Sequence, residues 1–207
     1  MLARKLTRKD RVMKRFGEIN KEIVCVLRAG GVGVLPTDTL YGLVGSALNK
    51  KAVSRIYQLK KRAPEKPFII LISSPKDLEL FNVKPDEKAS GVLKNVWPGP
   101  VSVVLPCNAA RLSYLRRKTK GLAFRLPKPA WLRKLLLQTG PLVAPSANWQ
   151  GMPPAQDIKQ AKQYFSNQVD FYCDAGKIRG QASALIEITR QGVKILRQGP
   201  LPKTLKL

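Results

Sequence analysis

Short apolar segments alternate with longer amphipathic segments along this chain. Residues 68–72 (FIILI) form an uninterrupted apolar run between Pro67 and Ser73-Ser74-Pro75. A run of this length is too short for a helix and typical of a buried strand. Residues 18–29 instead space their apolar side chains at helical intervals and end at Gly30. The chain is therefore expected to form layers of helices on a sheet.

The same patterns place the other elements of a single α/β domain. A length of 207 residues suits one such domain with a proper core, and the alternation favours a twisted, mixed, open sheet flanked by helices. We assign 1–17 to a basic N-terminal arm, 18–200 to the domain and 201–207 to a C-terminal tail. Helices are predicted at 18–29, 50–62, 85–96, 129–138 and 155–165, and strands at 32–35, 68–72, 101–105, 122–126, 141–144, 169–173, 183–188 and 193–197.

The chain contains no histidine, and this excludes several mechanisms. Ser-His-Asp and Cys-His nucleophile pairs need an imidazole to take the proton, and most catalytic zinc sites use one as a ligand. A cationic site that positions phosphates needs none. Neither a G-x-x-x-x-G-K-[ST] loop nor a G-x-G-x-x-G turn after a strand is present, so a nucleotide would need another kind of site.

Positive charge dominates the composition. Lys and Arg number 38 against 13 Asp and Glu, a formal charge of +25, so we expect anionic partners such as nucleotides, RNA or an anionic membrane face. Any single basic run can equally be a solvated surface. The three separated cysteines indicate neither a disulfide framework nor a metal site and fit a reducing cytosol. We expect no signal peptide and no membrane span.

Two segments near the middle of the chain carry candidate ligand-binding side chains. Thr37, Asp38 and Thr39 follow a strand end, where open α/β sheets bind ligands, although they could also cap a helix. Lys60, Arg62 and Lys66 follow a helix and could converge on a polyanion, or could satisfy the helix's free carbonyls.

Two further segments add short polar side chains and a buried charge. Ser146 and Asn148 follow a strand and suit a phosphate or ribose, although both are also ordinary turn formers. Arg125 lies in an apolar strand. An unpaired buried charge is costly, so a bound carboxylate or phosphate is a natural partner for it. Trp97 to Pro100 is interpreted as a rigid turn with a core tryptophan.

Taken together, these segments resemble the YrdC-type threonylcarbamoyl-AMP synthase family. The shared features are 36–43 (PTDTLYGL), the Lys60-Lys61-Arg62 cluster, Trp97 to Pro100 (WPGP), 125–127 (RLP) and 144–151 (APSANWQG), and the resemblance covers roughly residues 18–200. It implies a short, single-domain form of the fold with a central basic cavity. Five motifs in register make a chance match improbable.

The resemblance also implies an activity. The family condenses L-threonine, bicarbonate or CO2, and ATP into threonylcarbamoyl-AMP and pyrophosphate, as a nucleotidyltransferase, for threonylcarbamoyladenosine in ANN-decoding tRNAs. It implies Mg²⁺ with the triphosphate, with Asp38 a weak candidate to contact it, cytoplasmic localisation and downstream tRNA threonylcarbamoyl transfer proteins. The implied site comprises Lys60 and Arg62 as catalytic residues; Lys60, Arg62, Lys66, Ser146, Asn148 and Arg197 for ATP; and Thr37, Thr39, Arg125 and Ser183 for threonine or its carbamate.

The sequence departs from the family pattern at several points. Ala63 interrupts K-x-R-P, Leu71 replaces a histidine, and 182–185 (ASAL) keeps Ser183 but loses the adjacent threonine. The chain stops soon after Arg197, so we expect it to lack the C-terminal lid domain of longer members, and either the N-terminal arm or the 111–120 loop to shield the product.

Two alternatives remain open at this point. One is a non-catalytic module of the same fold that binds tRNA or double-stranded RNA, which the +25 charge favours. The other is a carbamoyl-adenylate domain like that of hydrogenase-maturation carbamoyltransferases. Those proteins usually embed the domain among acylphosphatase-like and zinc-finger segments that this sequence does not contain.

Overall fold

The computed structural model describes residues 12–14, 21–63, 65–189, 191–203 and 205. Within these ranges ten strands form one open sheet in the order β1-β8-β2-β3-β7-β4-β6-β5-β9-β10. Parallel and antiparallel pairs both occur, so the predicted mixed α/β sheet is confirmed. The strands are β1 (Val12–Lys14), β2 (Val32–Pro36), β3 (Tyr41–Ser46), β4 (Ile69–Leu71), β5 (Val101–Pro106), β6 (Gly121–Arg125), β7 (Leu142–Val143), β8 (Phe171–Asp174), β9 (Ala184–Thr189) and β10 (Gly192–Arg197).

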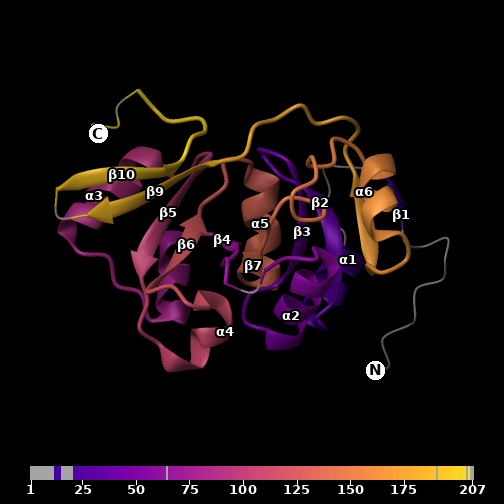
Figure 1. Ribbon diagram of the computed structural model, residues 1–207, viewed down its shortest axis with the longest axis horizontal. Helices are drawn as coiled ribbons and strands as arrows, with labels where there is room; N and C mark the ends of the chain where they lie inside the picture. Colours follow the sequence, from indigo (N-terminus) through magenta and orange to yellow (C-terminus); the bar gives the residue numbers. More distant parts are fainter. Residues whose placement is uncertain (1–11, 15–20, 64, 190, 204, 206–207) are drawn as a thin grey trace.

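Six α-helices and two short 3-10 helices connect the described strands. None of these helices is long and apolar enough to cross a membrane. Figure 1 shows the β9–β10 hairpin at one end of the molecule and α6 with β1 at the other. The helices are α1 (Lys21–Arg28), α2 (Lys50–Leu59), α3 (Glu87–Val96), α4 (Ser113–Arg116), α5 (Ala130–Thr139), α6 (Ile158–Phe165), η1 (Pro75–Phe81) and η2 (Ala110–Leu112).

Two parts of the sequence interpretation need correction. The sequence predicts no strand between 32–35 and the helix at 50–62, so 36–43 would be a connection, but its second half begins β3, which pairs with β2. Gly42 and Gly45 dilute the apolar pattern there, so the strand was not recognised. Within the expected basic arm, Val12–Lys14 forms a strand parallel to β8, and the rest of 1–17 lies outside the described residues.

The core forms two layers, one on each face of the sheet. Successive strand residues alternate between them, as the period of two requires: Ile70 packs in the layer with α2, α3 and α6, whereas Leu71 packs in the layer with α1 and α5. Helices α1 and α5 cover the half of their face formed by β8, β2, β3, β7 and β4. The other half, over β6, β5 and β9, carries the cavity described below.

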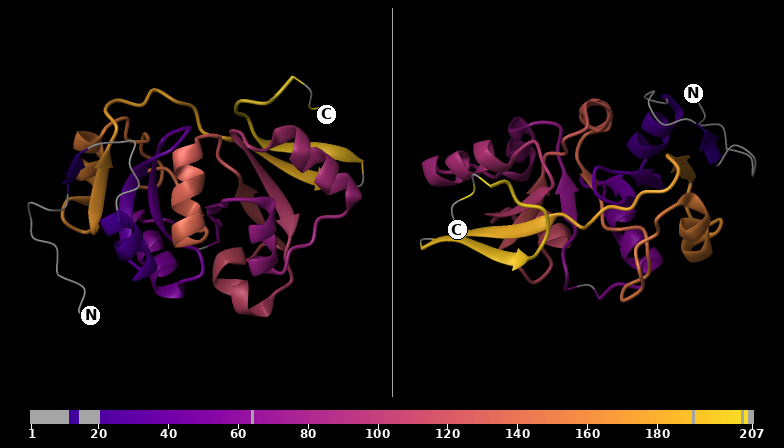
Figure 2. Two further views of the ribbon diagram at one scale, coloured as in Figure 1. Left: turned by 180° about the vertical axis from the view of Figure 1, so that it is seen from behind. Right: turned by 90° about the horizontal axis from the view of Figure 1, so that it is seen from above.

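A long connection joins the two ends of the sheet. Residues 175–183 run from β8 to β9 across the top of the molecule, as both Figure 1 and the right-hand view of Figure 2 show. The hydroxyl of Tyr41 anchors the start of this connection, because it donates to the Gly176 carbonyl at 2.7 Å and accepts from the Ala175 amide at 2.9 Å. Tyr41 is fully buried and so packs as a structural residue.

Candidate active site

The uncovered half of the sheet forms the floor of a cavity of about 810 Å³. Alternate residues of neighbouring strands face it: Ala123 and Arg125 on β6, Val104 on β5, and Leu185 and Glu187 on β9. The floor thus carries small or apolar side chains at several positions and a positive charge at Arg125. The β2–β3 turn, the 60–67 loop, the 144–146 segment and Thr119 to Gly121 supply the walls.

The β2–β3 turn is held by the hydroxyl of Thr37. This hydroxyl donates to the Leu40 carbonyl at 2.7 Å and accepts from the Thr39 and Leu40 amides at 3.2 Å. Its oxygen lies 3.0 Å from the Thr39 hydroxyl oxygen. Such side-chain bonds to the local backbone are why threonine suits a tight turn. They fix the Thr39 side chain at the edge of the cavity.

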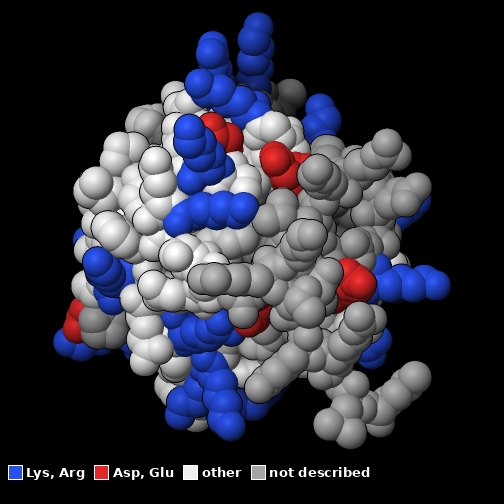
Figure 3. Space-filling view, turned by 90° about the vertical axis from the view of Figure 1, so that its right-hand side faces the viewer, with Lys and Arg blue, Asp and Glu red and all other residues white. Residues whose placement is uncertain are grey.

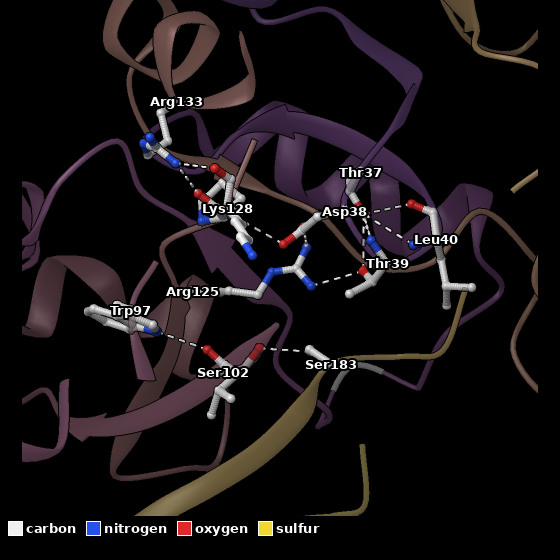
Figure 4. Close-up of polar contacts among 12 residues, drawn as sticks. Thr37, Asp38, Thr39, Leu40, Trp97, Ser102, Arg125, Lys128, Arg133 and Ser183 are labelled. Carbon is white, nitrogen blue, oxygen red and sulfur yellow. Dashed lines mark hydrogen bonds and ion pairs between the residues drawn. The ribbon is translucent and has the colours of Figure 1, made fainter. Parts of the chain in front are cut away.

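Arg125 joins this turn to the cavity floor. Its Nη1 donates to the Thr39 hydroxyl at 2.9 Å, and its Nη2 lies 3.3 Å from a carboxylate oxygen of Asp38, as Figure 4 shows. Burial lowers the pKa of Arg125; the Asp38 charge opposes that effect and the Arg197 charge adds to it. Among the described residues the buried Nε finds no hydrogen-bond acceptor. A bound anion would satisfy it.

Arg62, Lys66 and Arg197 add positive charge to the same cavity. The pKa of Arg197 is lowered first by burial and then by the charge of Arg62, so these two guanidinium groups repel one another. Arg62 is held by its own loop, because its Nε donates to the Lys66 carbonyl at 3.2 Å. A polyanion between these groups would relieve their repulsion.

Lys60 lies behind the cavity wall. Its side chain is 1% exposed, and its Nζ donates to the Ser146 carbonyl, to the Asn148 carbonyl at 2.8 Å and to the Asn148 side-chain oxygen at 3.2 Å. The Ser146 hydroxyl donates to the same side-chain oxygen at 2.6 Å. Burial, and secondarily the charge of Arg62, lowers the pKa of Lys60 to about 7.

The predicted site residues therefore fall into two groups. Lys60 and Asn148 form the buried network that supports the 146–148 segment, and their direct contact with ATP stays a prediction. Leu71, where the family pattern has a histidine, is fully buried in the core layer with α1 and α5. The predicted residues that line the cavity are Thr37, Thr39, Arg62, Lys66, Arg125, Ser146, Ser183 and Arg197.

Several lining residues were not singled out from the sequence. Glu65 and Glu187 bring negative charge to the lining, and Lys120 and Asn108 add polar groups. The alternation along β9 could have indicated Glu187, since it is two residues from Leu185 and four from Ser183. The 111–120 loop, expected to shield the product, contributes Thr119 and Lys120 to the wall. In the same loop, Nζ of Lys118 lies 3.6 Å from a carboxylate oxygen of Glu65.

A comparison with known protein families decides the relationship. The model of the Sua5/YciO/YrdC family, described as "Telomere recombination", matches residues 25–199. The chain belongs to this family. The matched range includes every predicted site residue and most of the described sheet.

Two curated relatives carry the same name. The chain is 34% identical over 178 residues to the threonylcarbamoyl-AMP synthase of Pyrococcus abyssi, covering 85% of this chain and 52% of that protein. It is 35% identical over 154 residues to the threonylcarbamoyl-AMP synthase of Coxiella burnetii, covering 73% of this chain and 82% of that protein. The chain thus spans about half the length of the archaeal relative and most of the bacterial one.

A solved structure shares the fold. The crystal structure of P. abyssi Sua5 complexed with L-threonine superposes with a TM-score of 0.80 at 32% identity, covering 87% of this chain and 54% of that chain. The sheet described above therefore shares its fold with part of a protein whose structure was solved as a complex with L-threonine.

Proposed function

We propose that this protein is an L-threonylcarbamoyladenylate synthase, a nucleotidyltransferase that makes threonylcarbamoyl-AMP and pyrophosphate from L-threonine, bicarbonate or CO2, and ATP. The observation that carries the proposal is the convergence of Arg62, Arg125 and Arg197 on one cavity. Their mutual repulsion favours a ligand with several negative charges. The name shared by the relatives supports the choice of substrates.

Different side chains of the cavity suit different substrates. At Arg125, Nη1 donates to the Thr39 hydroxyl, and the buried Nε has no acceptor among the described residues. This side chain suits the carboxylate or carbamate of threonine because a guanidinium binds planar oxyanions through parallel hydrogen bonds. Arg62 and Lys66 suit the phosphates. The Ser146 hydroxyl lines the same cavity and would reach a phosphate oxygen by turning its proton away from the Asn148 side-chain oxygen. Lys60 supports Ser146 from behind the wall.

The reaction needs no protein nucleophile. The threonine amine adds to CO2, forming an N–C bond and releasing a proton. An oxygen of the resulting carbamate then attacks the α-phosphorus; the new O–P bond forms as the bond to the β-phosphate oxygen breaks, and pyrophosphate leaves with the electron pair. The cations hold the reactants in line and neutralise the charge that develops on the leaving group.

Mg²⁺ is proposed to accompany ATP. The described residues contain no group of three metal-ligating side chains, so they fit a metal held mainly by the phosphates and water rather than by the protein. Asp38 is a weak protein contact for the ion because its carboxylate already faces Arg125. The metal would supply further charge neutralisation at the phosphates.

RNA binding without catalysis is the second candidate. The formal charge of +25 favours it, and on the face in Figure 3 Lys and Arg side chains cover more of the described surface than Asp and Glu do. If the protein is a synthase, the same positive charge would favour binding of tRNA or double-stranded RNA. For the synthase we also propose a cytoplasmic location and downstream tRNA threonylcarbamoyl transfer proteins as partners.

Pyrophosphate release separates the two candidates. Release from ATP should require both L-threonine and bicarbonate, and should collapse in Arg62→Ala and Ser146→Ala. Folded protein that releases no threonine-dependent pyrophosphate but binds RNA with strong salt sensitivity would support the second candidate instead.

A further inference from the structure

The hydroxyl of Ser183 has two protein partners at the edge of the cavity. Its oxygen accepts from Nη2 of Arg197 at 3.0 Å and lies 2.9 Å from the hydroxyl oxygen of Ser102 on β5. Arg197 also donates to the Ser183 carbonyl through Nε and Nη2, so its guanidinium binds both the backbone and the side chain of Ser183. Ser183 lines the cavity, and Figure 4 shows Ser102 beside it.

The direction of the hydrogen bond between the two serines follows from which hydroxyl has another place to donate its proton, because both residues are buried and only Ser183 lines the cavity. Ser102 is 0% exposed, and Ser183 is the partner that the described structure gives its hydroxyl. If Ser183 were the donor, the proton of Ser102 would be buried without an acceptor, which folded proteins avoid. Ser102 is therefore the donor.

This assignment determines what Ser183 can do. A serine oxygen has two acceptor sites and one proton. Arg197 and Ser102 occupy both acceptor sites, and the proton is left over. Ser183 is only 3% exposed, but it lines the cavity, so a molecule bound there can supply the acceptor for that proton.

We propose that Ser102 is a positioning residue that makes Ser183 a hydrogen-bond donor toward an anionic oxygen of the ligand. The inference rests on the proposed function for the identity of that ligand, which offers carbamate and phosphate oxygens. The neighbouring arginines Arg125 and Arg197 favour such an oxygen. Since 182–185 (ASAL) has no second hydroxyl beside Ser183, the orientation of this one matters more.

A double-mutant cycle tests the proposal. Ser102→Ala should lower kcat/KM about tenfold, because an oriented donor to a charged group is lost. The same substitution made in Ser183→Ala should have no further effect on kcat/KM. Ser102→Thr keeps the hydroxyl and suits a strand, so it should restore most of the activity. Separate KM values for L-threonine and for ATP identify which oxygen Ser183 contacts.

Cys107→Ala is the matched control. Cys107 follows the same strand, is 1% exposed and donates weakly from its Sγ to the Phe81 carbonyl at 3.3 Å, whereas Ser102 bonds to Ser183; Phe81 does not line the cavity and Ser183 does. It should lower stability without changing either KM. If Ser102→Ala matched this control in kcat/KM, or if its effect were equally large with and without Ser183, the proposal would be wrong.

Direct binding keeps this result separate from the synthase activity. Calorimetric titration with L-threonine alone and with pyrophosphate alone should show the same non-additive loss for at least one of the two probes. If the wild-type protein released no pyrophosphate, but Ser102→Ala and Ser183→Ala weakened binding non-additively, the proposed function would be overturned and the role of Ser102 supported. Binding to both probes that is unaffected by Ser102→Ala would overturn the role of Ser102.

Discussion

The amine of Lys60 lies 2.8 Å from the carbonyl oxygen of Asn148, and the residue is buried inside the protein. No carboxylate lies among the acceptors that the structure gives this amine, which are two carbonyls and one amide oxygen. A buried cation with only neutral partners loses much of its hydration free energy. Lys60 therefore supports the Ser146 segment at a cost in stability that depends on its protonation.

The first prediction concerns this pH dependence. The pKa of Lys60 is about 7 in the folded protein against an ordinary 10.5. Between those values the unfolded chain holds the proton more tightly, so the free energy of unfolding should rise with pH, by at most about 1.4 kcal/mol per unit. Urea unfolding between pH 7 and 9 measures it. Burial raises the pKa of Tyr41 to about 12 and acts in the opposite direction above pH 10, outside this window.

Lys60→Met provides the comparison. Methionine fills a similar volume without a charge, so the rise with pH attributable to Lys60 should disappear. An unchanged slope in the variant would show that other groups cause it. The variant should also lose pyrophosphate release. Without the lysine amine, the carbonyls of Ser146 and Asn148 lose their donor, and Ser146 is no longer held in place.

The second prediction separates binding from stability at Arg62. Its charge lowers the pKa values of both Lys60 and Arg197, so removing it relieves repulsion in the empty cavity. Arg62→Ala should weaken ATP binding about 10-fold to 100-fold while changing the free energy of unfolding by less than about 1 kcal/mol. Calorimetry and urea unfolding measure the two effects. Lys50→Ala, at an exposed cation of α2, should change neither.

Much of the sheet was predictable, and the exceptions have physical causes. Strands with unbroken apolar runs, such as 68–72, were recognised because both faces of the sheet are covered there. The strand β3 was missed because Gly42 and Gly45 interrupt its pattern. Tertiary packing explains Gly45, where a Cβ would lie 3.1 Å from Ile56; at Gly42 a Cβ would make only ordinary contacts, the Pro145 carbonyl being 3.6 Å away, so packing does not explain that glycine.

The site was predictable in its residue types but not in its distances. The motifs indicated Arg62, Arg125 and Ser146, which line one cavity. They did not indicate that Lys60 turns inward, because its partners are 86 and 88 residues away along the chain. Ser102 was missed because a serine in 101–105 (VSVVL) looks like an ordinary strand position, and only its burial beside Ser183 distinguishes it.

The third prediction concerns the geometry of Arg125. Its guanidinium reaches Thr39 and Asp38 at once, which the compact ammonium of a lysine cannot do. Arg125→Lys should raise KM for L-threonine at least about tenfold and leave KM for ATP nearly unchanged. Steady-state kinetics with each substrate varied in turn distinguish the two. Arg133→Lys is the control, because Arg133 contacts backbone carbonyls of residues 127 and 128 and does not line the cavity.

The fourth prediction concerns the connection between β8 and β9 where it crosses the β2–β3 turn. A Cβ added at Gly180 would lie 1.7 Å from the carbonyl oxygen of Thr39, so either the connection or the turn must move. Both carry cavity residues, Ser183 and Thr39. Gly180→Ala should therefore raise KM for L-threonine and lower the free energy of unfolding by about 1 to 3 kcal/mol.

Gly91→Ala is the matched substitution for this test. Gly91 lies in α3, and an added Cβ meets nothing within 4 Å. Alanine there should raise the free energy of unfolding by about 0.5 to 1 kcal/mol, because glycine weakens a helix, and should leave KM unchanged. Opposite signs for the two variants would locate the effect in the contact between residue 180 and Thr39. Equal behaviour would mean that the connection yields to a methyl group without disturbing the turn.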